Sequence, residues 1–222
     1  MSTILVLGAS RGIGLEFVRQ YRAHWDRVIA TARDDAGLAR VEALGAKPLR
    51  VDVTDAKSIS SLGWELDGEK IDLALYVAGV YTRGGAKQPP SQDEFDRTMH
   101  TNVLGAMHAI TQVAPMVEAA EGKFVFVTSE MGYISGVDSS FGWVYRTSKA
   151  ALNMAVASAQ PDYPKAIFTV INPGWVQTDM GGAGAPLKVE DSVASMCKTI
   201  AGLTRRHQGA FVNHDGRRYK GW

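Results

Sequence analysis

Short apolar segments alternate with longer amphipathic segments along most of the chain. The apolar segments have the length of strands, and they predict strands over Thr3–Leu7, Arg27–Thr31, Pro48–Val51, Ile71–Val77, Lys123–Thr128, Ala166–Ile171 and Ala210–Val212. Several of them are apolar throughout, which is typical of parallel strands that are covered on both faces. The segments between them predict helices over Ile13–His24, Asp35–Leu44, Asp55–Leu66, Ser91–Glu118, Val144–Ala159 and Val189–Leu203.

This alternation indicates the fold class. Repeated strand–helix units predict an α/β protein with an open, mostly parallel sheet, and right-handed crossovers make such a sheet doubly wound and Rossmann-like. The 222 residues suffice for one core and are too few for two ordinary domains, so we expect a single domain over residues 1–222. Within it, we expect the stretch Ser91–Glu118 to form two helices that break near Thr101–Gly105.

Composition and charge argue against several classes of protein. The chain has 24 Lys and Arg against 23 Asp and Glu, without the basic excess of a nucleic-acid binder, so no nucleic-acid partner is expected. Its single cysteine, Cys197, allows no intrachain disulfide and fits a cytoplasmic protein. No apolar run approaches the ~20 residues of a membrane span, and no signal peptide is recognised. We therefore expect no membrane partner, and we expect no metal site.

A glycine-rich turn follows the first predicted strand. Gly8 suits the tight turn out of the strand, Gly12 allows the backbone to approach a diphosphate, and Gly14 allows the helix to pack closely on the sheet. Such a cluster alone can be an ordinary turn. Its place after the first strand of an α/β pattern favours a dinucleotide site.

The end of the second predicted strand bears on the choice of cofactor. A carboxylate there holds the adenosine ribose of NAD, whereas a cation accommodates the 2′-phosphate of NADP. Arg33 stands at this position, and Arg11 in the glycine turn can reach the same phosphate, although both can also be solvated surface residues. NADPH or NADP+ is therefore favoured, while Asp34 and Asp35 leave room for NAD(H).

Three further positions have competing interpretations. Asp52, at the end of the third strand, can bind the adenine amino group or mark a helix start. Ser129, after the fifth strand, can bind a substrate carbonyl at the sheet edge where such folds bind ligands, with Thr128 and, less favoured, Ser135 as competitors. Asn102, at the expected helix break, can order a water molecule in a proton path or cap a helix.

Tyr145 and Lys149 lie four residues apart in a predicted helix and therefore share a face. A tyrosine phenol has a reference pKa near ~10, which is poorly matched to proton transfer at neutral pH. A fixed ammonium nearby favours the phenolate, so we expect Lys149 to lower the pKa of Tyr145. The same spacing is common by chance on protein surfaces, and its position after the fifth strand is what favours a catalytic role.

In this order, the motifs resemble the short-chain dehydrogenase/reductase family, and the resemblance covers essentially the whole chain. Three segments are similar, more narrowly, to its C-factor/sniffer-like carbonyl reductase branch: Met131–Ile134, Tyr145–Asn153 and Asn172–Gly182. The resemblance implies hydride transfer between a nicotinamide and a carbonyl or alcohol carbon. The implied roles are general acid/base for Tyr145, ribose anchor for Lys149, carbonyl orientation for Ser129 and a fourth catalytic position for Asn102.

The resemblance also implies a set of cofactor-binding residues. In addition to Tyr145 and Lys149, this set contains Gly8, Ser10, Arg11, Gly12, Ile13, Gly14, Arg33, Asp52, Val53, Ala78, Gly79, Pro173, Gly174, Val176 and Thr178. Helix pairing into a homodimer is common in the wider family and is a further expectation.

Three functions remain open on the sequence. The first is an NADP(H)-dependent reductase of a small-molecule carbonyl, or dehydrogenase of an alcohol. The second is a non-catalytic NAD(P)(H)-binding signalling or regulatory protein of the C-factor type, and the third is a structural module without cofactor. The intact Ser–Tyr–Lys set favours the first. A hydrophobic substrate is expected if the following side chains converge, whereas ordinary core packing is the competing interpretation: Tyr133, Phe141, Trp143, Trp175 and Met180.

Overall fold

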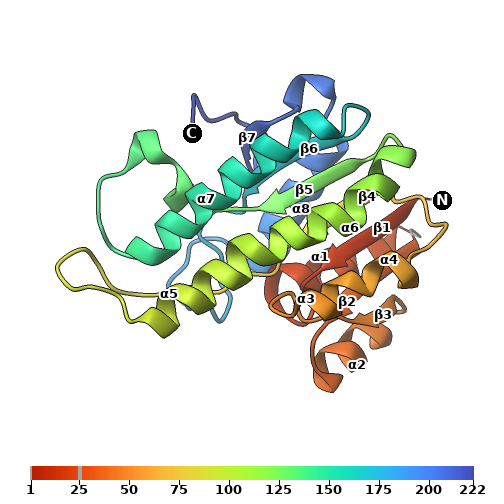
Figure 1. The fold of residues 1–222 in the computed structure, drawn as a ribbon, viewed down its shortest axis with the longest axis horizontal. Helices are drawn as coiled ribbons and strands as arrows, with labels where there is room; N and C mark the ends of the chain where they lie inside the picture. Colours follow the sequence, from red (N-terminus) through yellow and green to blue (C-terminus); the bar gives the residue numbers. More distant parts are fainter. Residues whose placement is uncertain (1, 25–26) are drawn as a thin grey trace.

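The computed structural model describes residues 2–24 and 27–222, and a seven-stranded parallel sheet forms its centre (Figure 1). The strands are β1 Thr3–Leu7, β2 Arg27–Ala32, β3 Lys47–Arg50, β4 Leu73–Tyr76, β5 Lys123–Val127, β6 Ile167–Asn172 and β7 Ala210–Asn213. Their order is β3-β2-β1-β4-β5-β6-β7, so the winding direction reverses between β1 and β4. This is the doubly wound, Rossmann-like sheet that the sequence predicts, and such sheets bind ligands at this reversal.

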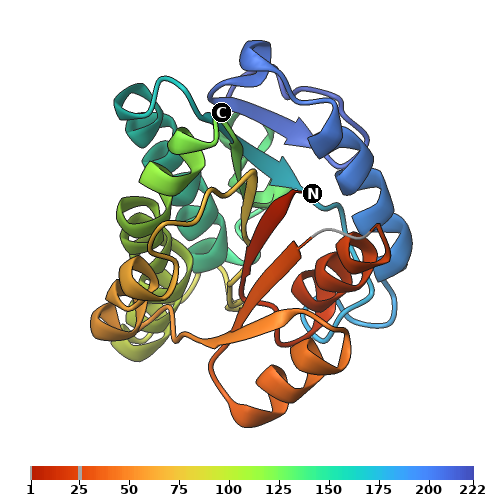
Figure 2. The same ribbon diagram turned by 90° about the vertical axis from the view of Figure 1, so that its right-hand side faces the viewer.

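Helices cover both faces of the sheet, as Figure 2 shows with the sheet seen from its end. One face carries α1 Gly12–Ala23 and α8 Val189–Ala201, and α2 Asp35–Ala43 lies beside β3. The other carries α3 Ala56–Ser60, α4 Leu62–Glu65, α6 Gly105–Ala119 and α7 Trp143–Ala159. The single helix expected over Asp55–Leu66 is therefore divided at Ser61 into two short helices.

The stretch expected to break near Thr101–Gly105 stays helical but changes its winding. Helix α5, Gln92–Met99, begins at a capping box formed by Ser91 and Glu94. It continues through a π-helical segment, η1 His100–Leu104, directly into α6. The N–H of Gly105 donates to the carbonyl of His100, which is the longer hydrogen bond of a π-turn. A π-turn of this kind is frequent at functional sites, and η1 contains Asn102.

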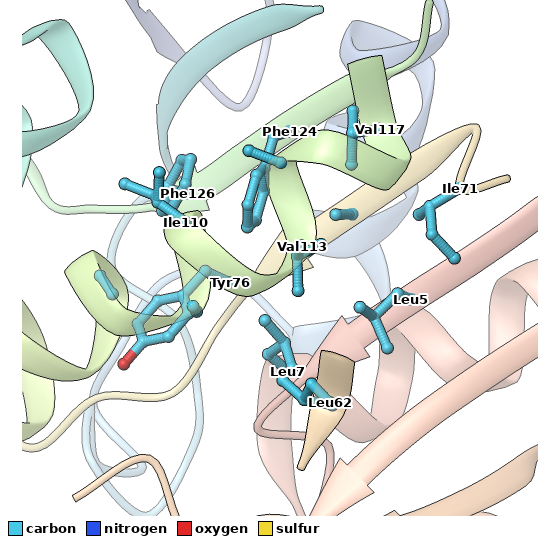
Figure 3. Close-up of a cluster of buried hydrophobic side chains, with 14 of the residues drawn as sticks. Leu5, Leu7, Leu62, Ile71, Tyr76, Ile110, Val113, Val117, Phe124 and Phe126 are labelled. Carbon is cyan, nitrogen blue, oxygen red and sulfur yellow. The ribbon is translucent and has the colours of Figure 1, made fainter. Parts of the chain in front are cut away.

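The core consists of two apolar clusters, one on each face of the sheet. Figure 3 shows part of the cluster beneath α6, where Val113 and Val117 lie against strand residues such as Leu5 and Phe124. Tyr76 of β4 is fully buried there, and its hydroxyl donates to the carbonyl of Thr101 at 2.8 Å. This bond ties η1 to the centre of the sheet. Within the described residues, none of the helices combines the length and apolar character that crossing a membrane requires.

Candidate active site

The residues singled out in the sequence come together at one edge of the sheet. Strands β1, β4, β5 and β6 are neighbours and run parallel, so the segments that follow them emerge at the same edge. These segments contain the glycine turn, Ala78 and Gly79, Ser129, and the loop that begins at Pro173. In Figure 1, the segments after β4 and β5 both extend to the left beyond this edge.

Tyr145 and Lys149 lie in the first two turns of α7 and face the same site. Their exposed fractions are 7% and 4%, so both polar side chains are buried. The Lys149 ammonium lies 5.6 Å from the centre of the Tyr145 ring and donates a hydrogen bond to the carbonyl of Val127 at 3.0 Å. That carbonyl ends β5, so the strand holds the lysine in place.

Of the three hydroxyls considered after β5, the structure brings Ser129 to Tyr145. Ser129 lies beside Tyr145 and acts to lower its pKa, and the Ser129 hydroxyl accepts the N–H of Met131 at 3.1 Å. Thr128 is buried and its hydroxyl is bonded to Asn153 at 2.7 Å. Ser135 is exposed and its hydroxyl donates to the carbonyl of Trp222. The position of Ser129 therefore favours it over both competitors.

Burial shifts both members of the tyrosine–lysine pair away from their charged forms. Burial raises the pKa of Tyr145 to about 12. The neighbouring Ser129 side chain acts to lower this pKa, and Tyr81 acts to raise it. Burial lowers the pKa of Lys149 to about 8. The net shift of Tyr145 is thus opposite to the one expected from the sequence, because desolvation of the phenolate outweighs the lowering effect of Ser129.

Asn102 projects from the π-turn η1 and is completely buried. Its side chain accepts the N–H of Val80 at 2.8 Å, donates to the carbonyl of Val80 at 2.9 Å and donates to the Ser148 hydroxyl at 2.9 Å. It therefore caps no helix and instead fixes the segment after β4 to α7. A Cβ at Gly79 would lie 3.4 Å from the Asn102 oxygen and 3.5 Å from the Lys149 ammonium, so Asn102 and Lys149 flank the same backbone.

The glycine turn packs tightly between β1, β4 and α1. Gly8 has a φ of +90°, and a Cβ there would lie 2.6 Å from the backbone nitrogen of Ala78. A Cβ at Gly14 would lie 2.1 Å from the carbonyl oxygen of Gly8, so a glycine is needed for the helix to start this close. Gly12 and Ile13 begin α1, whose N-terminal N–H groups suit an anion.

The loop after β6 lies against this turn. Val176 is buried and forms an isolated parallel bridge with Leu187. The Thr178 methyl lies 3.5 Å from the position of a Cβ on Gly12. The carbonyl of Pro173 accepts a hydrogen bond from Ser192 at 2.7 Å, which fixes the start of the loop. The two halves of the expected cofactor site are therefore adjacent.

Comparison with known proteins identifies the family. The model of the short chain dehydrogenase family matches residues 2–186. The chain belongs to the short-chain dehydrogenase family. Its doubly wound, Rossmann-like sheet is that of an oxidoreductase of this family.

Two curated relatives and two solved structures resemble this short-chain dehydrogenase. The C-signal of Myxococcus xanthus is 38% identical over 149 residues, which cover 66% of this chain and 90% of that protein. The 1-hydroxy-2-glutathionyl-2-methyl-3-butene dehydrogenase of Rhodococcus sp. (strain AD45) is 32% identical over 97% of this chain and 98% of its own length. The carbonyl reductase Sniffer of D. melanogaster superposes with a TM-score of 0.91 at 27% identity, covering 100% of both chains. A carbonyl reductase from Pseudomonas aeruginosa PAO1 in complex with NADP gives a TM-score of 0.82 at 26% identity, also covering 100% of both chains.

The two arginines expected at the adenosine end of this short-chain dehydrogenase have different surroundings. Arg33 is exposed directly after β2. Arg11 is paired with Asp179 of the loop after β6, with 3.0 Å between its Nη1 and the carboxylate Oδ2. Asp34 accepts the N–H of Gly37 as the N-cap of α2, and Asp35 is paired with Arg50, so both carboxylates already have partners.

Asp52 and Val53 lie at the neighbouring end of β3. Hydrogen bonds from Thr54 to the Asp52 carboxylate, from its hydroxyl at 2.7 Å and its N–H at 2.9 Å, lower the pKa of Asp52, and nearby Arg33 lowers it further. The helix cap belongs to Asp55, which accepts the N–H of Lys57. The carbonyl of Val53 packs against Gly105. Asp52 is therefore ionised beside Arg33.

Two residues of the site escaped the sequence analysis. Tyr81 packs edge-on against Tyr145, with 4.8 Å between the ring centres. Arg40 of α2 donates from its Nε to the carbonyl of Ser10 at 2.8 Å, which brings a second guanidinium, in addition to that of Arg11, to the glycine turn. Tyr81 follows Ala78, Gly79 and Val80 after a central strand, and this position was the available signal. The helical position of Arg40 gave no comparable signal.

The aromatic side chains expected to form a substrate pocket divide into two groups. Tyr133 packs on Phe211 and Tyr219, at 6.2 Å and 5.0 Å between ring centres, so it belongs to an internal cluster. Phe141 lies 6.5 Å from Tyr81 and is largely exposed. Trp143, Trp175 and Met180 are likewise exposed. Tyr81 and Phe141 thus give the tyrosine side of the site an aromatic wall.

Proposed function

We propose that this short-chain dehydrogenase is an NADP(H)-dependent carbonyl reductase. The observation that carries the proposal is the placement of buried Tyr145 between Ser129 and the buried Lys149 ammonium, which lies 5.6 Å from the centre of the Tyr145 ring. It supports a site in which a substrate carbonyl oxygen receives hydrogen bonds from both hydroxyls. The NADP complex of the similar Pseudomonas aeruginosa carbonyl reductase supports the choice of cofactor.

The residues present fit a nicotinamide dinucleotide. An ammonium has three N–H donors, and among the described residues Lys149 donates to one acceptor, the carbonyl of Val127. Its remaining donors suit the ribose hydroxyls. The start of α1 suits the diphosphate, and the exposed guanidinium of Arg33 suits a 2′-phosphate. When bound, the cofactor supplies or accepts the hydride.

Each catalytic side chain has a distinct task in this proposal. Because burial raises the pKa of Tyr145 to about 12, its phenol holds a proton at neutral pH and can deliver it to a carbonyl oxygen. Ser129 orients that oxygen. Lys149 anchors the ribose and places a positive charge that favours the phenolate left after proton transfer. Asn102 holds the backbone of Val80 in place through two hydrogen bonds. We assign to it, in addition, the ordering of a proton path behind Lys149.

The aromatic wall supports a hydrophobic aldehyde or ketone as substrate, or the corresponding alcohol in the reverse direction. Tyr81 and Phe141 provide flat apolar surfaces beside Tyr145. The similarity to the C-signal raises the alternative of a role limited to cofactor binding. This alternative is not favoured, because binding alone does not require a buried tyrosine beside a serine.

The test is NADPH oxidation with a panel of hydrophobic aldehydes, ketones and quinones, comparing the native protein with Tyr145→Phe. Loss of the acid should lower kcat by about 10²–10⁴-fold, while the Kd for NADPH stays within about twofold of the native value because the phenol adds one hydrogen bond at most. Tight NADPH binding by both proteins without turnover of any carbonyl would reject the reductase proposal. Equal turnover by both would reject Tyr145 as the acid.

A further inference from the structure

Asn172 joins several parts of the site through one buried amide. It is the last residue of β6 and is 3% exposed. Its oxygen accepts the N–H of Glu130 at 3.1 Å and the N–H of Gly174 at 3.2 Å. Its nitrogen donates to the Asn213 side-chain oxygen and to the Tyr219 hydroxyl, each at 2.9 Å. A carboxamide has two donor hydrogens and two acceptor lone pairs, so its full hydrogen-bonding capacity is used.

The side-chain oxygen of Asn172 holds two peptide groups that belong to different segments of the site. The N–H of Glu130 belongs to the peptide bond that follows Ser129, the residue that orients the substrate carbonyl. The N–H of Gly174 begins the loop that continues to Val176 and Thr178, on the proposed nicotinamide side. One oxygen atom thus links the substrate side of the site to the cofactor side.

The donor half fixes which way the amide points. Asn213 presents its oxygen to Asn172, and the Asn213 side chain also acts to lower the pKa of Asp215, as expected for an amide N–H directed at an ionised carboxylate. Burial acts to raise the pKa of Asp215, but hydrogen bonds from Arg217 and Asn213 lower it to about 2, so the carboxylate stays ionised. The Tyr219 ring is held by Phe211, with 4.1 Å between ring centres, and by Tyr133 at 5.0 Å. A reversed amide would place its NH2 group against two N–H donors.

We propose that Asn172 is a positioning residue for hydride transfer, which holds the Ser129–Glu130 peptide and the Gly174 peptide at a fixed separation, with Asn213 and Tyr219 fixing its amide. This inference rests on the proposed function. Asn172 reaches the reaction through backbone groups and contacts none of the glycine-turn residues by a hydrogen bond in the described structure. Its loss should therefore change the rate of the chemical step much more than the affinity for NADPH.

The test compares Asn172→Ala and Tyr219→Phe with the native protein and with Tyr163→Phe as matched control. Tyr163 stacks on Phe168 away from the site, so its hydroxyl has no part in the proposal. A misplacement near 1 Å costs about 10²-fold in rate, so Asn172→Ala should lose about 10–10²-fold in kcat. Tyr219→Phe keeps the packed ring and should lose about two- to tenfold, the equivalent of one hydrogen bond. The Kd for NADPH should change by less than about twofold in both, since neither variant removes a hydrogen bond to the glycine turn or to Lys149.

Two further readouts separate positioning from a general loss of structure. The kinetic isotope effect with NADPH deuterated at the nicotinamide C4 should rise in both variants and stay unchanged in Tyr163→Phe. Amide hydrogen exchange at Glu130 and Gly174 should accelerate in the same two variants, while the rest of β6 stays protected. If Asn172→Ala does not fold, Tyr219→Phe alone carries the test.

Either of two results would overturn the inference while leaving the proposed function intact. The first is an active native protein whose Tyr219→Phe variant keeps the native kcat and isotope effect. The second is unchanged exchange at both amides. A native protein that reduces no carbonyl would overturn the proposed function, and this inference with it, so the two failures are distinguished by the first assay.

Discussion

The proposed catalytic region and the proposed cofactor-selecting region of this protein are held together in different ways. Tyr145, Lys149 and Asn102 are at most 7% exposed. Lys149 is fixed by a hydrogen bond to the carbonyl of Val127, which ends β5, and Asn102 by one to the carbonyl of Val80 in the segment after β4. Arg11 and its partner Asp179 have side chains that are 72% and 76% exposed, and Arg33 is exposed as well. Packing thus fixes the geometry of the chemical step, whereas exposed charge is available to select the cofactor. Changes in the first region should alter rates strongly, and changes in the second should alter affinities modestly and in a salt-dependent way.

The largest effect is expected from Lys149→Met. Removing the buried ammonium takes away the charge that favours the phenolate, so kcat should fall by at least about 10²-fold. Because burial lowers the pKa of Lys149 to about 8, the native kcat should also decline as the pH rises through about 8, where the ammonium loses its proton. Tyr145, with its pKa raised to about 12, keeps its proton across that range. The measurement is the pH profile of kcat from pH 6 to 10.

The control for this prediction is Lys165→Met, which removes an exposed lysine and should keep both the rate and the pH profile. A Lys149→Met variant that retains the decline near pH 8 would show that another group causes it. The contrast between the two regions would then lose its strongest support.

An intermediate effect is expected from Arg33→Ala. If its guanidinium binds the 2′-phosphate, the Kd for NADPH should rise about tenfold, which corresponds to the loss of one charge-assisted hydrogen bond. The Kd for NADH should stay unchanged, and the difference should shrink at high salt. Titration of both cofactors by fluorescence measures this, with the exposed Arg206→Ala as control. Equal weakening of both cofactors would contradict the assignment of Arg33 to the 2′-phosphate.

The smallest effect is expected from Asp179→Ala. Exposed ion pairs contribute less than about 1 kcal/mol, so the free energy of unfolding should hardly change. The released Arg11 becomes available to the cofactor, and NADPH should bind about two- to threefold more tightly at low salt, within the range of one such pair. Parallel titrations at low and high salt check this, with the exposed Asp162→Ala as control. Weaker binding of NADPH would show that the Arg11–Asp179 pair supports the site.

The regular parts of the fold could be read from the sequence because apolar strands and glycine turns have local signatures. The seven strands lie where the apolar runs predict them, within a few residues at each end. The clustering of Ser129, Tyr145 and Lys149 followed from their places at strand ends and on one helix face. The winding of η1 had no such signature, because a π-turn depends on its contacts with distant segments. In η1, the Asn102 side chain accepts the N–H of Val80, and the Thr101 carbonyl accepts the hydroxyl of Tyr76.

The features that the sequence did not predict depend on distances between segments far apart in the chain. The pKa of Tyr145 was expected in the wrong direction because its spacing to Lys149 reveals a charge but gives no measure of burial. Arg11 was expected to reach the 2′-phosphate, and its pairing with Asp179, 168 residues away in the chain, was not predicted. Tyr81 and Arg40 likewise reach the site from loops and helices whose direction only the folded chain determines.

The π-turn η1 has a consequence for the phase of the helical run that contains it. A π-turn holds one residue more than an α-turn, and each residue of an α-helix rotates the chain by about 100°. Helices α5 and α6 are therefore out of phase by one residue although they form a continuous run. The buried side chains of α6 include Ala106, Ala109 and Val113, and α5 buries Thr98. Without the extra residue, these two buried faces could not both contact their present neighbours. The extra residue thus shifts the register between α5 and α6 within one continuous helical run.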